Sequence, residues 1–432
     1  MRVWLVTGGE PLPIGGGVAD RLYRTGSFAG HLASAGHDVI WWSPDFDHRR
    51  KRHFGTIMDT VESALSYRIK LLPSPGYSRN ISLRRLFDHG VVGYRFARNA
   101  KIVPPPQIIV ASLPTLELAS RAVRYGNSKG VPVVLDLRDM WPELYIWHLP
   151  KSMQTIAKGV AYPLFRWRND CLARASALWA ISDDFLSWGL RCARRKRREN
   201  DGAFFMVDRS PAPEDGAVQE ARLYWDKVLG QNQNGEIVGC FVGSISHQYD
   251  LATVASAAVA ARRAGANIRF VIAGDGETLS SLAERYDATS GIIWPGWIDR
   301  MRLLALLERC HFGLDPMPAR PDFEATINNK AVDYLKAGRG IVSCPDRGAL
   351  ARLLIENGCG ISYPHGDVQA LTKIFMKLAA DHRVAAQWSI AARTFSQSEL
   401  DPSRIYGSMT TCLERMVAEV QERAKDKLCH MR

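Results

Sequence analysis

Short apolar segments alternate with helical segments in the second half of the chain, and this alternation restricts the fold more than any other feature. The segments IVGCFVG (237–243) and IRFVIAG (268–274) are apolar throughout and rich in β-branched residues, as strands buried on both faces are. Between them, residues 250–265 have a helical pattern with Asp250 near its start and Gly265 at its end. Repeated units of this kind predict a parallel, doubly wound α/β sheet with ligand sites at the carboxyl ends of its strands.

The first half shows the same alternation with longer insertions. Strand-like segments at 38–42, 107–112 and 131–139 are separated by helical stretches, and 432 residues suffice for two domains that each bury a core. We therefore predict two Rossmann-like domains facing one another across a cleft. The expected parts are an N-terminal domain at 1–200, a linker region at 201–236, a C-terminal domain at 237–403, and a long helix at about 404–428 that either caps its own domain or returns to the first.

Composition narrows the partners and the compartment. The formal net charge of +12 favours an anionic partner, and basic clusters lie at 49–52 (RRKR) and 191–198 (RCARRKRR). No nucleic-acid-binding motif accompanies them, so we expect no nucleic acid and favour an anionic membrane surface. No apolar run reaches the ~18 residues of a membrane span, and no signal segment precedes the first strand, which predicts a cytoplasmic protein. The eight cysteines are scattered along the chain and none forms a CxxC pair, so we expect reduced thiols in the core rather than a metal site.

Three turns that follow predicted strands carry small residues suited to a phosphate. They are Gly243-Ser244, Gly274-Asp275-Gly276 and Gly296-Trp297-Ile298. Backbone N–H groups exposed at such turns can donate to an anion. One such turn alone is a weak signal, but three at the same edge of one sheet predict a binding rim.

The segment 322–338 (DFEATINNKAVDYLKAG) is the most informative stretch. Short polar residues end at Asn329 and suit a helix N-cap, so the next helix would direct free N–H groups at an anion. Lys330 would add a full charge, and Asp333, one turn further, could accept hydrogen bonds from ribose hydroxyls. A nucleoside diphosphate fits this layout. Spacing alone is equally compatible with an ordinary amphipathic helix that has a solvated lysine and aspartate.

Two segments of the first half are candidates for substrate contacts. The loop GGEPLPIGGG (8–17) does not fit a dinucleotide fingerprint, so its glycines Gly15, Gly16 and Gly17 indicate either close approach to a sugar or phosphate or a surface loop. The segment DLRDMWPE (136–143) closes an apolar strand with three carboxylates and an arginine, where substrate contacts or turn-capping roles both belong.

These residues together resemble the retaining GT-B glycosyltransferases of family four, in particular the branch of bacterial O-antigen and capsule transferases. The resemblance extends over nearly the whole chain. The segments that carry it are GEPLP with RLYRTG (9–13, 21–26), HDVIWWSPDFDH (37–48), RNISLRRLFDH (79–89), VVLDLRDMWPE (133–143), FVGSISHQYDL (241–251), FVIAGDGE (270–277) and INNKAVDYLKAG (327–338).

The resemblance implies transfer of a hexosyl or N-acetylhexosaminyl unit from a nucleotide diphosphate sugar with retention at the anomeric carbon. It implies no cofactor and no metal, because the helix start and basic side chains would neutralise the leaving diphosphate. The acceptor would be a polyprenyl- or otherwise lipid-linked glycan, used in polysaccharide or lipopolysaccharide assembly at the inner face of the cytoplasmic membrane. The implied catalytic residues are Asp136, Asp139 and Lys330; the implied donor-binding residues are Gly243, Ser244, Gly274, Trp297, Ile298, Ile327, Asn328, Asn329, Lys330 and Asp333; the implied acceptor-binding residues are Gly15, Gly16, Gly17 and Arg138.

The sequence departs from the family pattern at four positions that concern the donor. A usual glutamate falls on Ala325, a usual arginine and lysine fall on Ser244 and Tyr249, and a common proline before the Asn-Lys pair falls on Asn328. These departures keep two alternatives open, a GT-B sugar-nucleotide epimerase and a catalytically degenerate binding or assembly partner. A membrane role is likewise one of two readings of residues 151–174, which mix apolar and basic residues: they either lie on an anionic bilayer or pack inward, with a break at Pro163.

Overall fold

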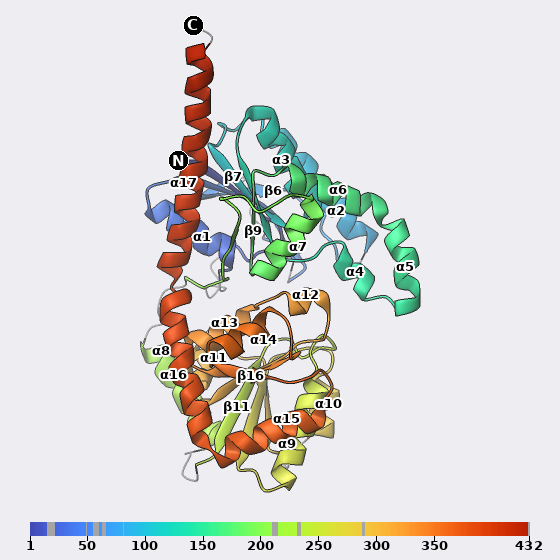
Figure 1. The fold of residues 1–432 in the computed structure, drawn as a ribbon, viewed down its shortest axis with the longest axis vertical. Coiled ribbons are helices and arrows are strands. Elements are labelled where there is room, and N and C mark those ends of the chain that lie inside the picture. Colours follow the sequence, from blue (N-terminus) through green and yellow to red (C-terminus); the bar gives the residue numbers. More distant parts are fainter. Residues whose placement is uncertain are drawn as a thin grey trace. The chain divides into compact units, whose positions relative to one another are not determined.

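The chain divides into two compact units in the computed structural model (Figure 1). Unit 1 comprises Met1–Ser210 and Pro402–Arg432, and unit 2 comprises Pro211–Asp401. The structure describes residues 1–14, 22–48, 50–54, 60–62, 66–80, 82–209, 215–230, 235–286 and 290–430.

Unit 1 is built on an eight-stranded sheet. Its strands are β1 (Arg2–Val6), β2 (Asp38–Pro44), β5 (Thr60–Glu62), β6 (Arg68–Leu72), β7 (Ile108–Leu113), β8 (Val133–Leu137), β9 (Ala177–Ala180) and β10 (Gly202–Ala203). They lie in the order β10-β9-β8-β7-β1-β2-β6-β5, and every neighbouring pair is parallel except β5 with β6. A separate antiparallel pair is formed by β3 (Phe46–Asp47) and β4 (Arg52–His53).

Helices cover both faces of this sheet. Neighbouring residues of β1 point to opposite faces and are apolar, so each face needs a helical layer to bury it. Its helices are α1 (Arg24–Ser34), α2 (Leu83–Asn99), α3 (Leu116–Lys129), α4 (Glu143–Trp147), α5 (Lys151–Val160), α6 (Tyr162–Arg174), α7 (Asp183–Ala193) and α17 (Pro402–His430). On one face Trp4 packs against Phe96 of α2 and Tyr125 of α3, with ring centroids 6.2 and 5.2 Å away. On the other face Leu5 lines a small cavity together with Phe28 of α1 and Met409 of α17.

The last helix belongs to unit 1 although it follows unit 2 in the chain. Tyr406 of α17 stacks on Phe28 at 5.8 Å and donates a hydrogen bond of 2.6 Å to the carbonyl of Val207. Arg415, further along α17, donates to the side chain of Asn200 at 2.8 Å. Of the two arrangements that the sequence left open for this helix, the structure has the return to the first unit.

Unit 2 is built on a six-stranded sheet. Its elements are α8 (Asp215–Leu229), β11 (Ile237–Val242), α9 (Leu251–Arg263), β12 (Ile268–Ala273), α10 (Leu279–Arg285), β13 (Ile292–Gly296), α11 (Arg300–Arg309), β14 (Phe312–Pro316), α12 (Pro321–Glu324), α13 (Asn329–Lys336), β15 (Gly340–Cys344), α14 (Ala349–Glu356), β16 (Gly360–Ser362), α15 (Val368–Ala380) and α16 (His382–Glu399). The strands lie in the order β13-β12-β11-β14-β15-β16 and all pairs are parallel.

Alternation along β14 again places helices on both faces. Phe312 packs against Phe270 and against Phe375 of α15, within one buried cluster. The next residue, Gly313, faces Tyr334 of α13, and a Cβ at this position would collide with that ring. The prediction of two parallel-sheet α/β domains is therefore confirmed.

Other expectations have mixed outcomes. The region assigned to a linker, 201–236, contains β10 and the helix α8, whose Trp225 is fully buried and donates to the carbonyl of Arg302. Eight of the fifteen residues of α8 are apolar, so a helix with a buried face forms within a region that is otherwise polar. The seven cysteines with described side chains are unpaired, and six of them are buried, as expected for core thiols.

Within the described residues no helix is both long and apolar enough to span a bilayer.

Candidate functional site

The loops that follow β11, β12 and β13 form one continuous rim at the carboxyl edge of the unit 2 sheet. The N–H of Gly243 donates to the carbonyl of Ala273, and the N–H of Gly274 donates to the carbonyl of Gly296, at 3.0 and 2.7 Å. The N–H of Ile245 donates to the backbone carbonyl of Asp275 at 2.9 Å. The three glycine turns predicted to share one edge therefore do so, joined by backbone hydrogen bonds.

Two glycines of this rim have no substitute because the loops cross closely. Gly274 and Gly276 have φ angles of +147° and +154°, which residues with a side chain rarely adopt. A Cβ on Gly274 would fall on the carbonyl of Gly243, and one on Gly276 would fall on that of Ile245. The glycines let the β12 loop press against the β11 loop, which brings their backbone groups to the same place.

The helix α13 begins where the sequence predicts, beside this rim. Asn328 has extended backbone angles, and its side-chain oxygen accepts from the N–H of Ala331 at 3.0 Å, so it is the N-cap. Helical geometry leaves the N–H groups of Asn329 and Lys330 without an acceptor inside the helix. Both residues are only half-buried, so this positive end is not sealed inside the protein.

Tyr334 fixes α13 against the sheet. Its hydroxyl accepts from the N–H of Val242, the last residue of β11, at 3.1 Å. Burial raises the pKa of Tyr334 well above its usual value, so it remains a neutral phenol. The start of α13 and the end of β11 are thus held together by a buried contact.

A buried carboxyl group lies under the start of α13. Asp315 on β14 is fully buried, and its Oδ2 accepts from the amide of Asn328 at 2.6 Å. Its Oδ1 has no hydrogen-bond partner among the described residues. Burial raises the pKa of Asp315, and the opposing effects of Lys330 and the Asn328 amide are smaller. Asp315 orients the capping side chain, and its burial disfavours the ionised form.

Lys330 lies across the β11 loop. Its Nζ donates to the hydroxyl of Tyr249 at 2.8 Å, and it stands 4.1 Å from the centre of that ring and 5.6 Å from that of Phe241. Its Cδ is a close neighbour of Gly243. The cation therefore rests on two aromatic rings beside the glycine turn, and Tyr249, at a position where the family carries a lysine, supplies its acceptor.

The remaining predicted donor residues follow the same edge. Ser244 is exposed, Asp333 is half-buried, and Ile327 and Ile298 are 7% exposed. Trp297, just after β13, has a side chain that is 70% exposed. The structure thus brings Gly243 next to both Gly274 and Lys330, and Asn328 caps the helix that carries Lys330 and Asp333.

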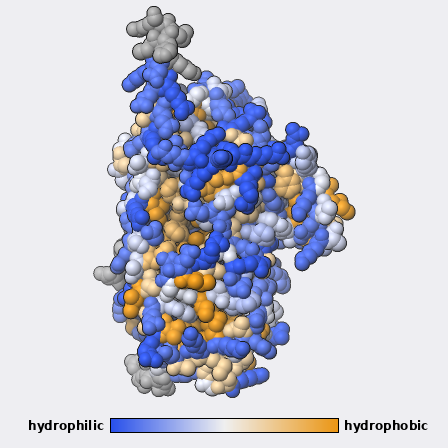
Figure 2. All heavy atoms as spheres, in the orientation of Figure 1, coloured by the Kyte–Doolittle hydropathy of each residue, from blue (hydrophilic) through white to orange (hydrophobic). Residues whose placement is uncertain are grey.

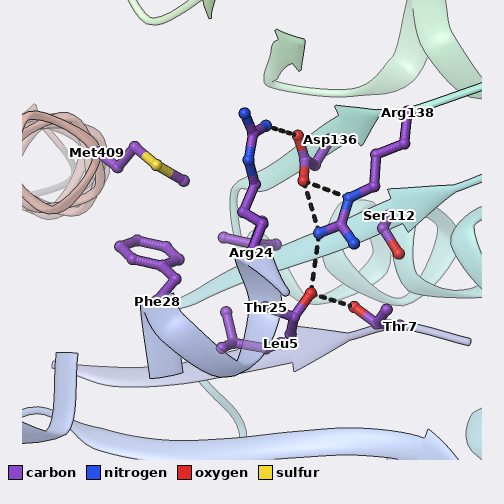
Figure 3. A pocket seen from close by; sticks show the side chains of 10 residues that line it. Leu5, Thr7, Arg24, Thr25, Phe28, Ser112, Asp136, Arg138 and Met409 are labelled. Carbon is purple, nitrogen blue, oxygen red and sulfur yellow. Dashed lines mark hydrogen bonds and ion pairs between the residues drawn. The ribbon is translucent and has the colours of Figure 1, made fainter. Parts of the chain in front are cut away.

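Two of the residues predicted in unit 1, Asp136 and Arg138, lie in a buried charge network (Figure 3). Arg24 donates to Oδ1 of Asp136 at 2.6 Å, and Arg138 donates to Oδ2 at 2.8 Å. Arg138 also pairs with Glu10 and donates to Thr25 at 2.9 Å. The side chains of Arg24 and Asp136 are 1% and 2% exposed. Two cations and two carboxylates balance one another here.

The electrostatics of this network follow from that pairing. Burial alone would raise the pKa of Asp136, but Arg24 and Arg138 outweigh it and hold the pKa below its usual value. Burial would lower the pKa of Arg138, and Glu10 and Asp136 raise it instead. The pairing therefore favours the charged forms of both Asp136 and Arg138.

This network leaves little space for a substrate. The cavity lined by Thr7, Arg24, Asp136 and Arg138 has a volume of about 10 Å³, about what one water molecule needs. Asp136 is thus placed to hold two arginines rather than to touch an acceptor, and its catalytic role stays a prediction. Asp139, three residues further, is exposed at the same strand end. Gly15, Gly16 and Gly17 lie outside the described residues.

Several residues of both sites were not assigned from the sequence. Asp315 stands in an otherwise apolar strand, HFGLDP, which signals a buried carboxyl but not its partner. Glu10 and Arg24 lie in the segments GEPLP and RLYRTG, which carried the family resemblance without a role. Tyr249 was noted only as a departure from the family pattern. Within the described residues, no group of three or more His, Cys, Asp or Glu side chains is arranged to hold a metal ion.

Comparisons with known proteins concern the family of unit 2 and the fold of the chain. Residues 236–381 match the family of glycosyl transferases group 1, which covers the rim and α13. A comparison by sequence with curated proteins found no match.

Three solved structures illustrate the similarity of fold. A sucrose-phosphate synthase from Thermosynechococcus elongatus has a TM-score of 0.69 at 15% identity and covers 97% of this chain and 99% of its own. HepE from Anabaena in complex with UDP has a TM-score of 0.65 at 14% identity, with coverage of 96% and 100%. WaaG, a glycosyltransferase involved in lipopolysaccharide biosynthesis, has a TM-score of 0.55 at 13% identity, with coverage of 97% and 99%. The fold is therefore that of the GT-B glycosyltransferases.

Proposed function

We propose that this chain is a retaining glycosyltransferase that moves a hexosyl or N-acetylhexosaminyl unit from a nucleotide diphosphate sugar to a lipid-linked glycan acceptor. Its place would be the inner face of the cytoplasmic membrane, in the assembly of cell-surface polysaccharide or lipopolysaccharide. The group 1 glycosyl transferase match over residues 236–381 supports the reaction class. HepE was solved with UDP, and WaaG acts in lipopolysaccharide biosynthesis, which supports the donor and the pathway by analogy.

The observation that carries the proposal is the rim of unit 2 with Lys330 beside it. Transfer of a sugar leaves negative charge on the departing diphosphate, so the site must offer donors and positive charge where that charge develops. The N–H groups at the start of α13 and the ammonium of Lys330, next to the Gly243 turn, meet this need. Asp333 would hold the ribose and the backbone at Trp297-Ile298 the base.

Nucleotide binding by the full chain tests the donor site. We expect UDP, GDP or ADP, or a sugar conjugate of one of them, to raise the melting temperature and to titrate in calorimetry. Lys330→Ala should weaken that binding by about 1.5–3 kcal/mol, roughly ten- to 150-fold, because a charge-assisted contact is lost. Lys336→Ala, an exposed lysine at the other end of the same helix, is the matched control and should bind normally.

The products distinguish the proposal from its rivals. Nuclear magnetic resonance of the product should show the anomeric configuration of the donor, since the proposed reaction retains it. Complete epimerisation of the sugar nucleotide without an acceptor would replace the transferase with an epimerase. A wild-type chain that binds no nucleotide would instead favour a non-catalytic partner, the role that Ser244, Tyr249 and Ala325 keep open.

A further inference from the structure

Exposed apolar side chains are concentrated in one part of unit 1. Among the described residues, ten of the fifteen large hydrophobic side chains that are exposed lie between residues 83 and 162. They belong to two helices and their flanks. The set is Leu83, Leu86, Phe87, Tyr94, Ile102, Leu149, Met153, Ile156, Val160 and Tyr162.

Helix α2 has an apolar stripe on its outer side as well as on its inner side. Val92 and Phe96 are buried and pack inward. Leu83, Phe87 and Tyr94 are 85%, 65% and 59% exposed, and their spacing, with Leu86 and Gly90 between them, places them on one face of the helix. A second stripe of this kind has no role in the core of unit 1.

Helix α5 has no buried residue. Met153, Ile156 and Val160 are 52%, 72% and 79% exposed and recur at the spacing of one helical face. Figure 2 shows hydrophobic surface at the edge of unit 1 where Figure 1 draws α5. Of the two readings of residues 151–174, α5 is exposed, whereas α6 packs inward through Arg168, Cys171 and Leu172, and the break falls at Ala161, two residues before Pro163.

The two helices are connected through their neighbours within unit 1. Helix α3 packs against both α2 and α6, and α6 in turn contacts α5. Helices α2 and α5 therefore belong to one connected group of helices.

The exposed charged side chains of α2 and α5 are all basic. The exposed charged residues of α2 are Arg84 and Arg98, and its one acid, Asp88, is buried; the two charged residues of α5 are lysines, Lys151 and Lys158. Lys51 of the first basic cluster lies over the Tyr77 ring at 4.7 Å, next to Arg85. In the second basic cluster, by contrast, Arg195 and Arg197 are paired with Asp201 and Asp183.

We propose that the exposed faces of α2 and α5 form a docking surface for an anionic lipid bilayer. Apolar side chains flanked by basic ones are the composition of helices that lie in a membrane interface, where the apolar groups enter the acyl boundary and the cations meet lipid phosphates. A soluble apolar partner would not explain the absence of exposed acidic residues on these two helices. The proposal extends the membrane location proposed above, but it concerns other residues than the donor site.

Vesicle binding by the full chain tests this surface. We expect co-sedimentation with vesicles of phosphatidylglycerol and phosphatidylcholine, and much weaker binding to phosphatidylcholine alone. The double variant Phe87→Ser/Ile156→Ser should bind about tenfold more weakly or worse, because two exposed apolar side chains no longer enter the bilayer. Ile355→Ser/Ile390→Ser, at 69% and 68% exposure in unit 2, is the matched control and should bind as the wild type does.

A charge variant distinguishes the contribution of lipid phosphates to vesicle binding from the contribution of apolar contacts. Arg98→Gln/Lys158→Gln should lower binding to the anionic vesicles about fivefold for each charge removed, and should not change binding to phosphatidylcholine. Equal binding by wild type and the Phe87/Ile156 variant, or no binding by wild type, would overturn the proposal. A wild-type dimer that this variant converts to a monomer would replace the bilayer with a second copy of the chain.

The outcome is independent of the donor site. Nucleotide-induced thermal shifts of the Phe87/Ile156 variant should equal those of the wild type, which also shows that the variant is folded. A failed nucleotide test with normal vesicle binding would reject the proposed reaction and leave the docking surface standing.

Discussion

Each unit buries one aspartate as the penultimate residue of an interior strand, and the two aspartates have opposite surroundings. Asp136 on β8 is held by two arginines, which keep its pKa below the usual value. Asp315 on β14 is held by the amide of Asn328, and burial keeps its pKa above the usual value. At the same place in a strand, the surroundings therefore favour the ionised aspartate in unit 1 and disfavour it in unit 2.

The difference explains why the two strand edges have different capacities to bind an anion. In unit 1 the charges of Arg24 and Arg138 are matched by Asp136 and Glu10, so little net charge remains. In unit 2 Lys330 donates to the neutral hydroxyl of Tyr249. Among the described residues no carboxylate forms an ion pair with Lys330, so its charge remains available beside the start of α13.

Removal of the anion in unit 1 should have the largest effect. Asp136→Asn leaves two buried arginines with one carboxylate, Glu10, and should lower the free energy of unfolding of unit 1 by about 3–5 kcal/mol. Because the pKa of Asp136 is lowered in the folded state, its contribution is present above the pKa of the unfolded chain and is lost as the pH falls through the folded value. Hydrogen exchange of β8 peptides against pH measures both effects.

The exposed Asp139 provides the control for that experiment. Asp139→Asn, at the same strand end, should leave the protection of β8 within about 0.5 kcal/mol of the wild type. Equal protection of β8 in Asp136→Asn and Asp139→Asn would show that the network contributes no stability.

The corresponding change in unit 2 should have the opposite sign. Asp315→Asn keeps an oxygen that accepts from Asn328 and removes a carboxyl group that is costly to ionise when buried, so it should stabilise unit 2 by on the order of 1 kcal/mol at neutral pH. Because the pKa of Asp315 is raised in the folded state, its contribution to stability is fully present below the pKa of the unfolded chain. That contribution is lost as the pH rises through the folded value. The gain should therefore disappear in acid.

Hydrogen exchange of β14 peptides at neutral and acid pH reports this gain. Destabilisation of unit 2 by Asp315→Asn at neutral pH would mean that the ionised carboxylate stabilises the fold through its attraction to Lys330. The contrast with unit 1 would then fail, because both aspartates would act as anions.

The sequence predicts the strands and the start of α13 well because both depend on local chemistry. The segment IVGCFVG forms β11. A strand that is buried on both faces needs a continuous run of apolar residues, and this segment provides one. Asn328 caps α13 because a short polar side chain can reach the N–H three residues later. The glycine turns at Gly243 and Gly274 are likewise local.

What the sequence does not predict depends on residues that are distant along the chain. Arg138 meets Glu10 from 128 residues away, and Arg24 meets Asp136 from 112. The carboxylates of DLRDMWPE are therefore compatible with substrate contacts or with turn-capping roles until the partners of Asp136 are known. The same holds for α5, whose composition fits an inward or an outward face until packing decides between them.

The smallest expected effect concerns how each unit holds its cation. Arg138 is fixed by two carboxylates, whereas Lys330 has one hydroxyl acceptor, that of Tyr249, among the contacts given above. Tyr249→Phe keeps the ring that packs on Phe241 at 5.3 Å and removes only that acceptor. We expect nucleotide affinity to fall about two- to tenfold, since one hydrogen bond contributes ~0.5–1.5 kcal/mol and Lys330 becomes less ordered.

Calorimetric titration with the nucleotide that binds wild type measures this change. Tyr286→Phe, which removes a hydroxyl bonded to Ser256 at 2.8 Å elsewhere in unit 2, is the matched control and should not alter affinity. If Tyr249→Phe binds nucleotide as tightly as the wild type or more tightly, the hydroxyl competes with the diphosphate for Lys330 instead of positioning it. The rim of unit 2 would then resemble unit 1, with a cation already committed to a partner within the protein.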